Sequence, residues 1–292
     1  MIGELVRVWT EDELQLQGLY CAPHDRSDLP AVLHIHGASS NFYRSQFLDR
    51  LADILTDRGF AFLTGNTRGH DIMNKVYSKD PTATRYLGVA HEVFEECALD
   101  VAAWIAFLWE RKHKKIVLLG HSFGAQKAAF YQGEASDERV KGLIFMSPPD
   151  HGLWIDALGS EAERLRSWAR EEMASGRGET LLDAGFASFP MSARAIHGLL
   201  GEAKSDIFRF GRPDEPWDVV AGLACPMLVT MGTVAEFIST RPEDSLATLR
   251  AKAVSSIRCD TLVIEGAPHS YRGFEAQVAE VTLDWLTDIF AR

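Results

Sequence analysis

Short apolar runs alternate with amphipathic segments along most of this chain of 292 residues. The apolar runs have the length and composition of buried strands, and they cover residues 31–36, 60–64, 115–119, 140–146, 226–231 and 261–264. Apolar residues at helical spacing predict helices between and after them, over 44–58, 92–112, 125–131, 243–254 and 274–290. Strands that alternate with helices predict an α/β fold, with a mostly parallel sheet and helices on both faces.

Two further segments complete this pattern. Residues 2–9 and 14–21 alternate or run apolar on either side of a polar tetrapeptide, which predicts an opening β-hairpin and brings the sheet to eight strands. Residues 151–222 contain no convincing strand, and their helical pieces are separated by Gly and Pro. We therefore expect them to form a helical cap, inserted between two strands of a core made of residues 1–150 and 223–292 and placed over the carboxyl ends of the strands.

The motif with the clearest chemistry is Gly120-His121-Ser122-Phe123-Gly124, which lies between an apolar run and a predicted helix. A Gly-x-Ser-x-Gly sequence at a strand-to-helix turn has the context of a nucleophile elbow. The sharp turn strains the serine backbone and brings its neighbours close together, so the positions two before and two after must lack a Cβ atom. We expect the strain to expose the Ser122 hydroxyl and the helix N-terminus to point at the reaction centre.

A serine hydroxyl is a weak nucleophile and needs a base. His269 is the candidate by position, because it follows the last predicted strand and so lies at the same edge of the sheet as the elbow. The backbone N–H of Phe123 and that of Ala38 are the candidate oxyanion-hole donors, and Gly37 lets the chain turn so that Ala38 faces the serine. His121 is expected to be structural rather than catalytic.

Composition and charge exclude several classes of function. The net charge is −11 and no Lys/Arg cluster is visible, which argues against nucleic-acid and membrane partners. The first residues do not resemble a signal peptide, and no apolar run approaches the length of a membrane span. Cys21, Cys97, Cys225 and Cys259 are widely spaced, so neither a metal site nor a disulfide framework is indicated. We expect a cytoplasmic protein with reduced thiols; a homodimer is compatible with the sequence, which does not fix the oligomeric state.

Taken together, these segments resemble the serine hydrolases of the α/β-hydrolase fold, of the carboxylesterase and acyl-hydrolase kind. The resemblance covers nearly the whole chain and rests on the elbow and on three further segments: His36-Gly37, Asn66-Thr67-Arg68-Gly69-His70 and Gly266-Ala267-Pro268-His269. It implies a triad of serine, histidine and acid, with acyl-enzyme chemistry, no cofactor and no metal.

The acid of this triad is where the sequence departs from the family. The family usually keeps it in Gly-x-x-Asp after the strand that follows the cap, and here the expected position holds Ala235, with Glu236 one residue later. Glutamate is one methylene longer and could reach the imidazole from there. Asp150, which follows the preceding strand, is the alternative; its other interpretation is an N-cap for the first cap helix.

The sequence favours a small, fairly apolar substrate, because aromatic residues are frequent in the cap and the N-terminal loop. We expect the pocket to be lined by Gly37, Ser39, Phe42, His121 and Trp154. The predicted function is hydrolysis of a carboxylic ester, lactone or thioester. The alternatives are C–C bond or amide hydrolysis on the same fold, or a non-catalytic ligand-binding protein on a hydrolase scaffold.

Overall fold

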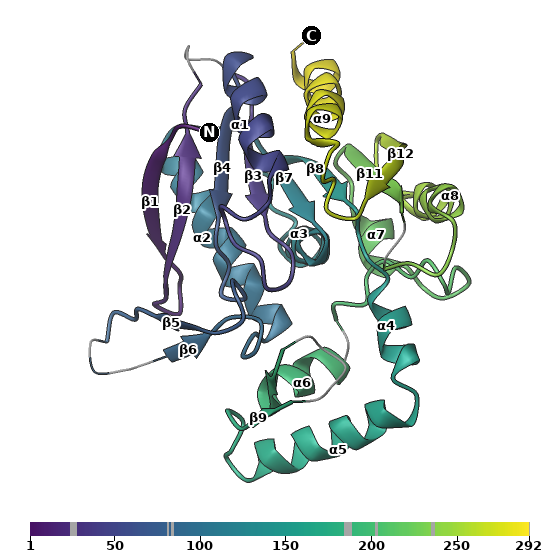
Figure 1. The fold of residues 1–292 in the computed structure, drawn as a ribbon. Helices are drawn as coiled ribbons and strands as arrows, with labels where there is room; N and C mark the ends of the chain where they lie inside the picture. The colour runs from purple at the N-terminus through teal and green to yellow at the C-terminus, as the bar shows by residue number, and fades with distance from the viewer. Residues whose placement is uncertain are drawn as a thin grey trace.

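A twisted eight-stranded sheet runs through the molecule (Figure 1). The computed structural model describes residues 1–291 apart from 24–27, 81, 83–84, 184–188, 202–203 and 235–236. The strands, in their order across the sheet, are β1 (Glu4–Trp9), β2 (Gln15–Cys21), β4 (Ala61–Gly65), β3 (Ala31–Ile35), β7 (Ile116–His121), β8 (Val140–Met146), β11 (Met227–Val234) and β12 (Cys259–Pro268).

The sheet is parallel except at the edge that begins the chain. The β1–β2 and β2–β4 pairs are antiparallel, and every other neighbouring pair is parallel. This confirms the predicted opening hairpin and the mostly parallel sheet of eight strands. Because the carboxyl ends of parallel strands lie at one edge, the loops that follow β3, β7 and β12 meet there.

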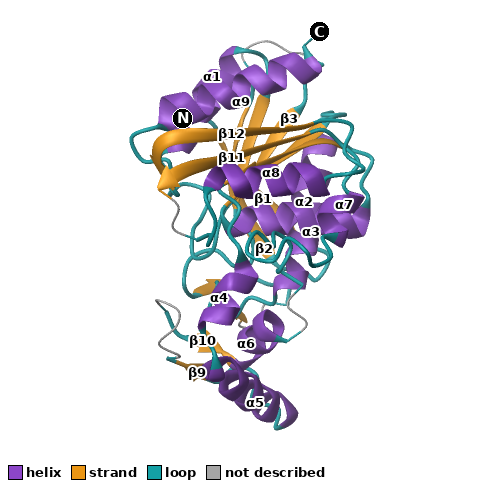
Figure 2. Cartoon of the chain, turned by 90° about the vertical axis from the view of Figure 1, so that its right-hand side faces the viewer, coloured by secondary structure: helices purple, strands orange, loops and turns teal. Residues whose placement is uncertain are grey.

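Helices cover both faces of the sheet, as predicted (Figure 2). One face is packed by α1 (Phe47–Asp57) and α9 (Glu275–Phe290), which contact each other. The other is packed by α2 (Cys97–Glu110), α3 (Phe123–Ala135) and α8 (Pro242–Lys252). The segment predicted as one helix over 92–112 starts later, with the single 3-10 turn η1 (Phe94–Glu96) leading into α2.

The chain between β8 and β11 begins beyond the carboxyl ends of the strands and then returns to the side of α3 (Figures 1 and 2). Its elements are α4 (His151–Ala157), α5 (Ser160–Ala174), β9 (Leu181–Leu182), β10 (Met191–Ser192), α6 (Ala193–Leu200) and α7 (Asp218–Gly222). The first part has its own small apolar core, made of Ile155, Leu165, Ala169, Met191, Ala195, Ile196 and Leu200. The later aromatic residues Phe208, Phe210 and Trp217 pack instead into the core of the sheet. The predicted cap segment thus contains two packing units.

Four short strands in the described part of the chain were not predicted from the sequence. β9 and β10 form an antiparallel pair within residues 151–222, where no strand was expected. β5 (Asn74–Val76) and β6 (Arg85–Leu87) form a separate antiparallel pair in the long connection after β4.

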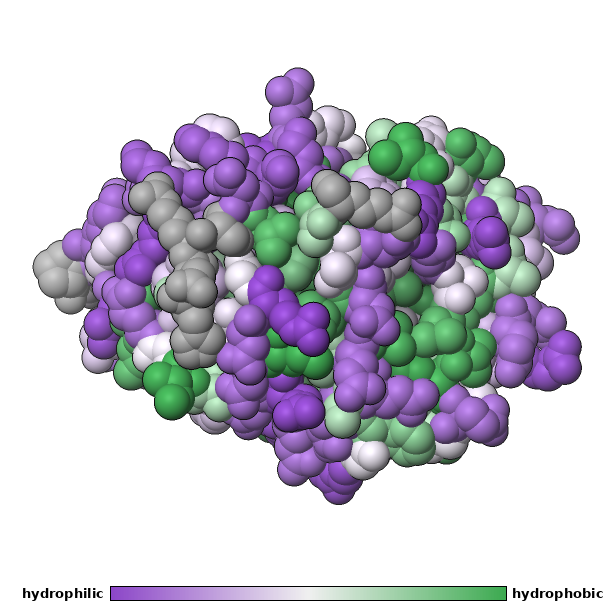
Figure 3. All heavy atoms as spheres, turned by 90° about the horizontal axis from the view of Figure 1, so that it is seen from above, coloured by the Kyte–Doolittle hydropathy of each residue, from purple (hydrophilic) through white to green (hydrophobic). Residues whose placement is uncertain are grey.

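On the face of the molecule away from α4–α6, hydrophobic patches lie scattered among hydrophilic side chains (Figure 3). None of the helices in the described part of the chain combines the length and the apolar composition needed to cross a membrane.

The connection after β4 is held by a buried arginine. Arg68 is 1% exposed, and its guanidinium contacts the carboxylates of Asp100, Glu96 and Asp12. Asp100 also accepts the Arg68 N–H at 2.7 Å, so this carboxylate fixes both the side chain and the backbone of Arg68. The cluster ties the loop after β4 to α2, and it places the loop that begins at Asn66 against the carboxyl edge of the sheet.

We expect Asp100→Ala to lower the free energy of unfolding by about 3–5 kcal/mol, because it removes one partner of a buried ion pair and leaves a buried charge less compensated. Urea denaturation followed by circular dichroism measures this loss. The matched control is Glu4→Ala, which removes the exposed carboxylate paired with Arg111 and should cost far less. Similar losses in the two variants would contradict the structural role of Asp100.

Candidate active site

The turn between β7 and α3 holds Ser122 in a strained conformation. Its φ is 56° and its ψ is −131°, a region that non-glycine residues rarely adopt. A Cβ atom at Gly120 would lie 2.3 Å from the Gly124 carbonyl oxygen, and one at Gly124 would lie 2.1 Å from the carbonyl oxygen of Ile35. Both glycines are therefore required by the close approach of the backbone, as the motif predicts.

A third glycine brings the loop after β3 against the serine. A Cβ atom at Gly37 would lie 2.9 Å from the Cβ atom of Ser122 and 3.2 Å from its Oγ. The register of the sheet brings the loop after β3 close to the turn after β7, because Ile35 pairs with Gly120 at the ends of the two strands. A side chain at position 37 would push the loop away from the hydroxyl.

His36 fixes the peptide group that follows Gly37. The Thr67 N–H donates to His36 Nε2 at 3.0 Å, so the ring carries its proton on Nδ1, which donates to the Gly37 carbonyl at 2.8 Å. Burial lowers the pKa of His36 well below its usual value and keeps the ring neutral. The Gly37 carbonyl and the Ala38 N–H point in opposite directions because they belong to one trans peptide. The hydrogen bond therefore directs the Ala38 N–H away from His36.

Two backbone N–H groups border the serine. Phe123 is the first residue of α3, so its N–H has no acceptor within the helix. Among the described residues, the Ala38 N–H donates to no other backbone group. Both residues line the same cavity as Ser122. The structure thus places the two expected donors around the serine, and their action on an oxyanion stays a prediction.

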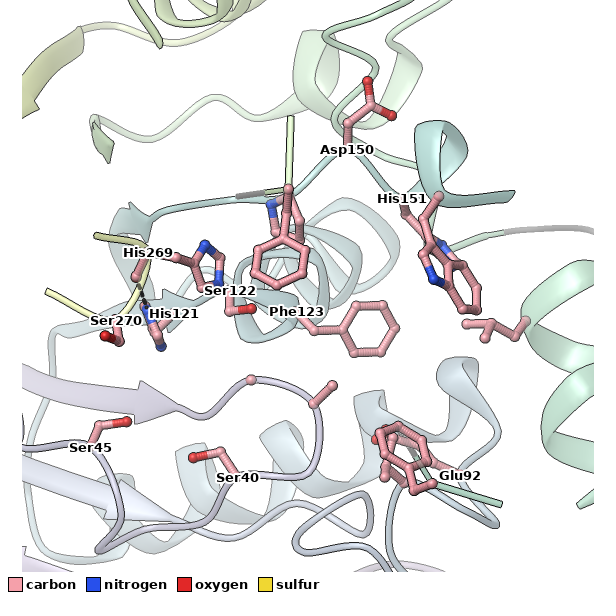
Figure 4. Close-up of a pocket in the computed structure, with 18 of the residues that line it drawn as sticks. Ser40, Ser45, Glu92, His121, Ser122, Phe123, Asp150, His151, His269 and Ser270 are labelled. Carbon is pink, nitrogen blue, oxygen red and sulfur yellow. Dashed lines mark hydrogen bonds between the residues drawn. The ribbon is translucent and has the colours of Figure 1, made fainter. Parts of the chain in front are cut away.

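His269 follows β12 and lies with Ser122 in the cavity wall (Figure 4). The rings of Phe237 and His269 pack in a T-shaped arrangement, with centroids 4.6 Å apart. Burial, together with the nearby His121, lowers the pKa of His269 to about 3. The ring is therefore neutral near pH 7, which is the state a general base needs.

His121 joins the elbow strand to the loop that carries His269. Its Nε2 donates to the His269 carbonyl at 2.9 Å, and burial lowers the pKa of the ring, which keeps it neutral. Its ring also packs against Phe47 and Tyr271. Tyr271 anchors the same loop through its hydroxyl, 2.7 Å from that of Thr230. His121 thus holds the loop of the candidate base in place while it also lines the cavity.

Of the two candidate acids, Asp150 is the one that lies among the described residues. Glu236 and Ala235 lie outside the described residues. Asp150 is described, and its side chain is fully buried. One of its carboxylate oxygens accepts the Leu153 N–H at 3.0 Å, which makes Asp150 the N-cap of α4, and the other accepts the Gly211 N–H at 2.7 Å. In Figure 4 the carboxylate points away from His269.

The cavity beside Ser122 has a volume of about 750 Å³. Of the residues expected to line it, Gly37, His121 and Trp154 do so, whereas Ser39 and Phe42 lie outside its wall. The sequence did not single out several other lining residues; they are Ser40, Arg44, Ser45, Gln46, Val89, Glu92, Phe94, Leu153, Met191, Leu199, Ser270 and Arg272. Most of them lie in connections between elements, where spacing gives no signal.

Glu92, one of these lining residues, is paired with a buried cation. The Lys127 ammonium lies 2.5 Å from the Glu92 carboxylate and donates to the Thr67 hydroxyl at 3.0 Å. Lys127 is completely buried in α3, one turn after the elbow. Within the described ranges, His, Cys, Asp and Glu side chains form no group of three or more that could hold a metal ion.

Comparison with known proteins places the chain among hydrolases. Residues 32–282 match the model of a family described as the alpha/beta hydrolase family. The human protein lipase member K is 26% identical over 168 residues, which cover 50% of this chain but only 42% of that protein. The chain thus spans less than half the length of this curated relative.

Several solved structures have the same fold at low sequence identity. Est1E from Butyrivibrio proteoclasticus with bound ferulic acid has a TM-score of 0.66 and 17% identity, over 98% of this chain and 100% of that one. The siderophore hydrolase EstB from Aspergillus fumigatus has a TM-score of 0.70 and 17% identity, over 99% and 98%. A thermostable carboxyl esterase from Bacillus coagulans has a TM-score of 0.70 and 13% identity, over 99% of each chain.

We expect the acid limb of the pH–rate profile to lie below pH 6.5, the ordinary value for a histidine. Burial lowers the pKa of His269, so the ring stays neutral and can still accept a proton as the pH falls through 6.5. The measurement is kcat/KM for p-nitrophenyl butyrate between about pH 4 and pH 8, at a wavelength where the product absorbance does not change with pH. Circular dichroism at each pH excludes unfolding as the cause. An acid limb at or above pH 6.5 would show that another group outweighs the effect of burial on the pKa of His269.

Proposed function

The chain belongs to the α/β hydrolase family, and on this premise we propose that it is a serine hydrolase of carboxylic esters, lactones or thioesters. The observation that carries the proposal is the strained position of Ser122 in the wall of a large cavity. His269 and the N–H groups of Ala38 and Phe123 border the same cavity. These are the groups that acyl transfer through a serine requires.

In the proposed mechanism His269 accepts the proton of the Ser122 hydroxyl as the oxygen attacks the carbonyl carbon of the ester. The N–H groups of Ala38 and Phe123 stabilise the negative charge that develops on the carbonyl oxygen. His269 then gives the proton to the departing alcohol, which leaves the acyl group on Ser122. Water, deprotonated by His269, then attacks the carbonyl carbon of the acyl group. The acid is released, and His269 returns the proton to the Ser122 oxygen.

We assign the acid of the triad to Glu236. Two observations support this assignment. Glu236 follows β11, which is next to β8 and β12 in the sheet. The alternative acid, Asp150, is already hydrogen-bonded to other groups. Both carboxylate oxygens of Asp150 already accept backbone N–H groups, and its side chain caps α4. A carboxylate held in this way cannot turn toward His269 without freeing two buried donors, and each freed donor costs about 1–3 kcal/mol.

The substrate is a small molecule with a fairly apolar part. The support is the side of the cavity formed by Trp154, Phe189, Met191 and Leu199, which come from the segment between β8 and β11. This segment acts as the cap that determines which acyl groups fit. Est1E with bound ferulic acid and the siderophore hydrolase EstB are esterase-like neighbours in fold, which agrees with an ester substrate.

Ser122→Ala should lower kcat for p-nitrophenyl butyrate by about 10⁴- to 10⁶-fold, because the nucleophile is lost. The matched control is Ser255→Ala, which changes an exposed serine and should leave kcat unchanged. A fluorophosphonate should add one label to the wild-type chain and none to Ser122→Ala, as measured by intact-protein mass. A label on another serine, or full turnover by Ser122→Ala, would contradict the assignment of Ser122 as the nucleophile and the mechanism proposed here.

Glu236→Gln should lower kcat by about 10³- to 10⁴-fold, the scale observed when a triad carboxylate becomes an amide. It should also move the acid limb of kcat/KM to lower pH, because a carboxylate partner raises the pKa of the imidazole. Asp150→Asn should have a milder effect on kcat and should lower the melting temperature, because an amide has only one acceptor oxygen and cannot replace both carboxylate oxygens that accept the Leu153 and Gly211 N–H groups. An inactive but folded Asp150→Asn beside an active Glu236→Gln would reverse the assignment.

A further inference from the structure

The cavity has two chemically different sides, with Ser122 between them. Figure 4 shows Ser45 and Ser270 on one side of Ser122 and His151 and Glu92 on the other. The side toward His151 is walled mainly by apolar side chains of the segment between β8 and β11. The opposite side is formed by the loop after β3 and the loop after β12, and it carries hydroxyl, amide and guanidinium groups. We call this second side the polar arm; its residues are Ser40, Arg44, Ser45, Gln46, Ser270 and Arg272.

The polar arm carries a net positive charge. Arg44 and Arg272 line it from two different loops, and among the described residues it contains no carboxylate. The carboxylates that the cavity wall does contain, those of Glu92 and Asp150, lie elsewhere and are already matched by Lys127 and by backbone N–H groups. The chain as a whole has a net charge of −11, so a side of the cavity with two arginines and no described carboxylate differs in sign from the overall charge.

Each arginine keeps most of its hydrogen-bond donors unused within the described part of the chain. Arg44 donates one hydrogen bond, from Nη1 to the Ser39 carbonyl at 3.2 Å, and makes no ion pair with a described residue. Arg272 likewise makes no ion pair with a described residue. Most of the donors of each guanidinium therefore remain free for a ligand. A guanidinium matches the two oxygens of a carboxylate in geometry as well as in charge.

We propose that the polar arm binds a carboxylate on the alcohol part of the ester, with Arg44 and Arg272 as the residues that recognise it. This inference rests on the proposed esterase function and specifies its substrate class. The side follows from the chemistry: His269 must protonate the departing alcohol, so the alcohol part lies beside His269. Ser270 follows His269 directly in the chain, Arg272 follows two residues later, and both line the cavity with it. The apolar acyl group then occupies the opposite side.

The experiment compares two esters that share a butyryl group and differ only in the charge of the alcohol part, 4-carboxyphenyl butyrate and 4-carbamoylphenyl butyrate. The readout is the ratio of their kcat/KM values in each variant, so the different intrinsic reactivity of the two esters cancels. Arg44→Gln/Arg272→Gln should lower this ratio by about tenfold relative to the wild type. Added salt should lower the ratio in the wild type but not in the double variant.

The matched control is Arg58→Gln. Arg58 is another exposed arginine that makes no ion pair with a described residue, and it lies at the far end of α1, away from the cavity. It should leave the ratio unchanged. A third ester, 4-carbamoylphenyl hydrogen glutarate, carries its carboxylate in the acyl part, and its hydrolysis should not depend on the two arginines.

A binding measurement separates this inference from the proposed function. In Ser122→Ala, isothermal titration calorimetry should show tighter binding of the anionic butyrate than of the neutral one, and adding Arg44→Gln/Arg272→Gln should remove the difference. Equal binding of the two esters, or an unchanged kinetic ratio in the double arginine variant, overturns the inference. A loss confined to the glutarate ester overturns the assignment to the alcohol side. Charge-selective binding with no hydrolysis of either ester by the wild type would count against the esterase proposal alone.

Discussion

The close approach of three backbone segments at Gly37, Gly120 and Gly124 is the constraint on which the catalytic edge depends. A side chain at any of these positions would meet backbone atoms or the serine itself. The strained angles of Ser122 cost roughly 1–3 kcal/mol. They persist because both ends of the turn are fixed: β7 is paired on both sides in the sheet, and the Ser122 N–H donates to the Met146 carbonyl of β8 at 2.9 Å. The rigidity of the central strands is thus what keeps the hydroxyl exposed.

Neutral histidines transmit this rigidity to the loops around the serine. His36 holds the peptide before Ala38, and His121 holds the loop of His269; each does so with one ring nitrogen that donates to a carbonyl. Burial lowers the pKa of both rings, so they stay uncharged in the folded state. Below their ordinary pKa of 6.5, the unfolded chain takes up protons that the folded chain does not, so folding becomes less favourable as the pH falls. The same burial that fixes the geometry therefore makes it sensitive to acid.

The parts of the molecule that follow from local pattern could be predicted, whereas those that depend on distant contacts could not. Apolar runs and helical spacing determine the eight strands and the main helices, and the steric demand of a sharp turn marks Ser122 through its flanking glycines. The three-residue strands β5 and β6 have no period long enough to detect. The cavity wall was predicted least well, because residues such as Val89 and Met191 reach it only through the path of long connections. Arg44 and Arg272 resemble any exposed arginine until the fold brings their loops to one cavity.

The charges in the cavity follow from what each acidic residue already holds. Asp150 caps α4 and fastens Gly211, so it joins the start of the inserted segment to its later part. Glu92 is paired with Lys127, which also holds the loop at Thr67. Moving either carboxylate toward a substrate would leave its buried partner, the Lys127 ammonium or two backbone N–H groups, uncompensated. Both carboxylates therefore have a structural role. The two arginines of the polar arm, by contrast, make no ion pair with a described residue. In the proposed mode of binding, electrostatic selectivity therefore arises from the loops after β3 and β12, next to the candidate base, and the inserted segment contributes shape.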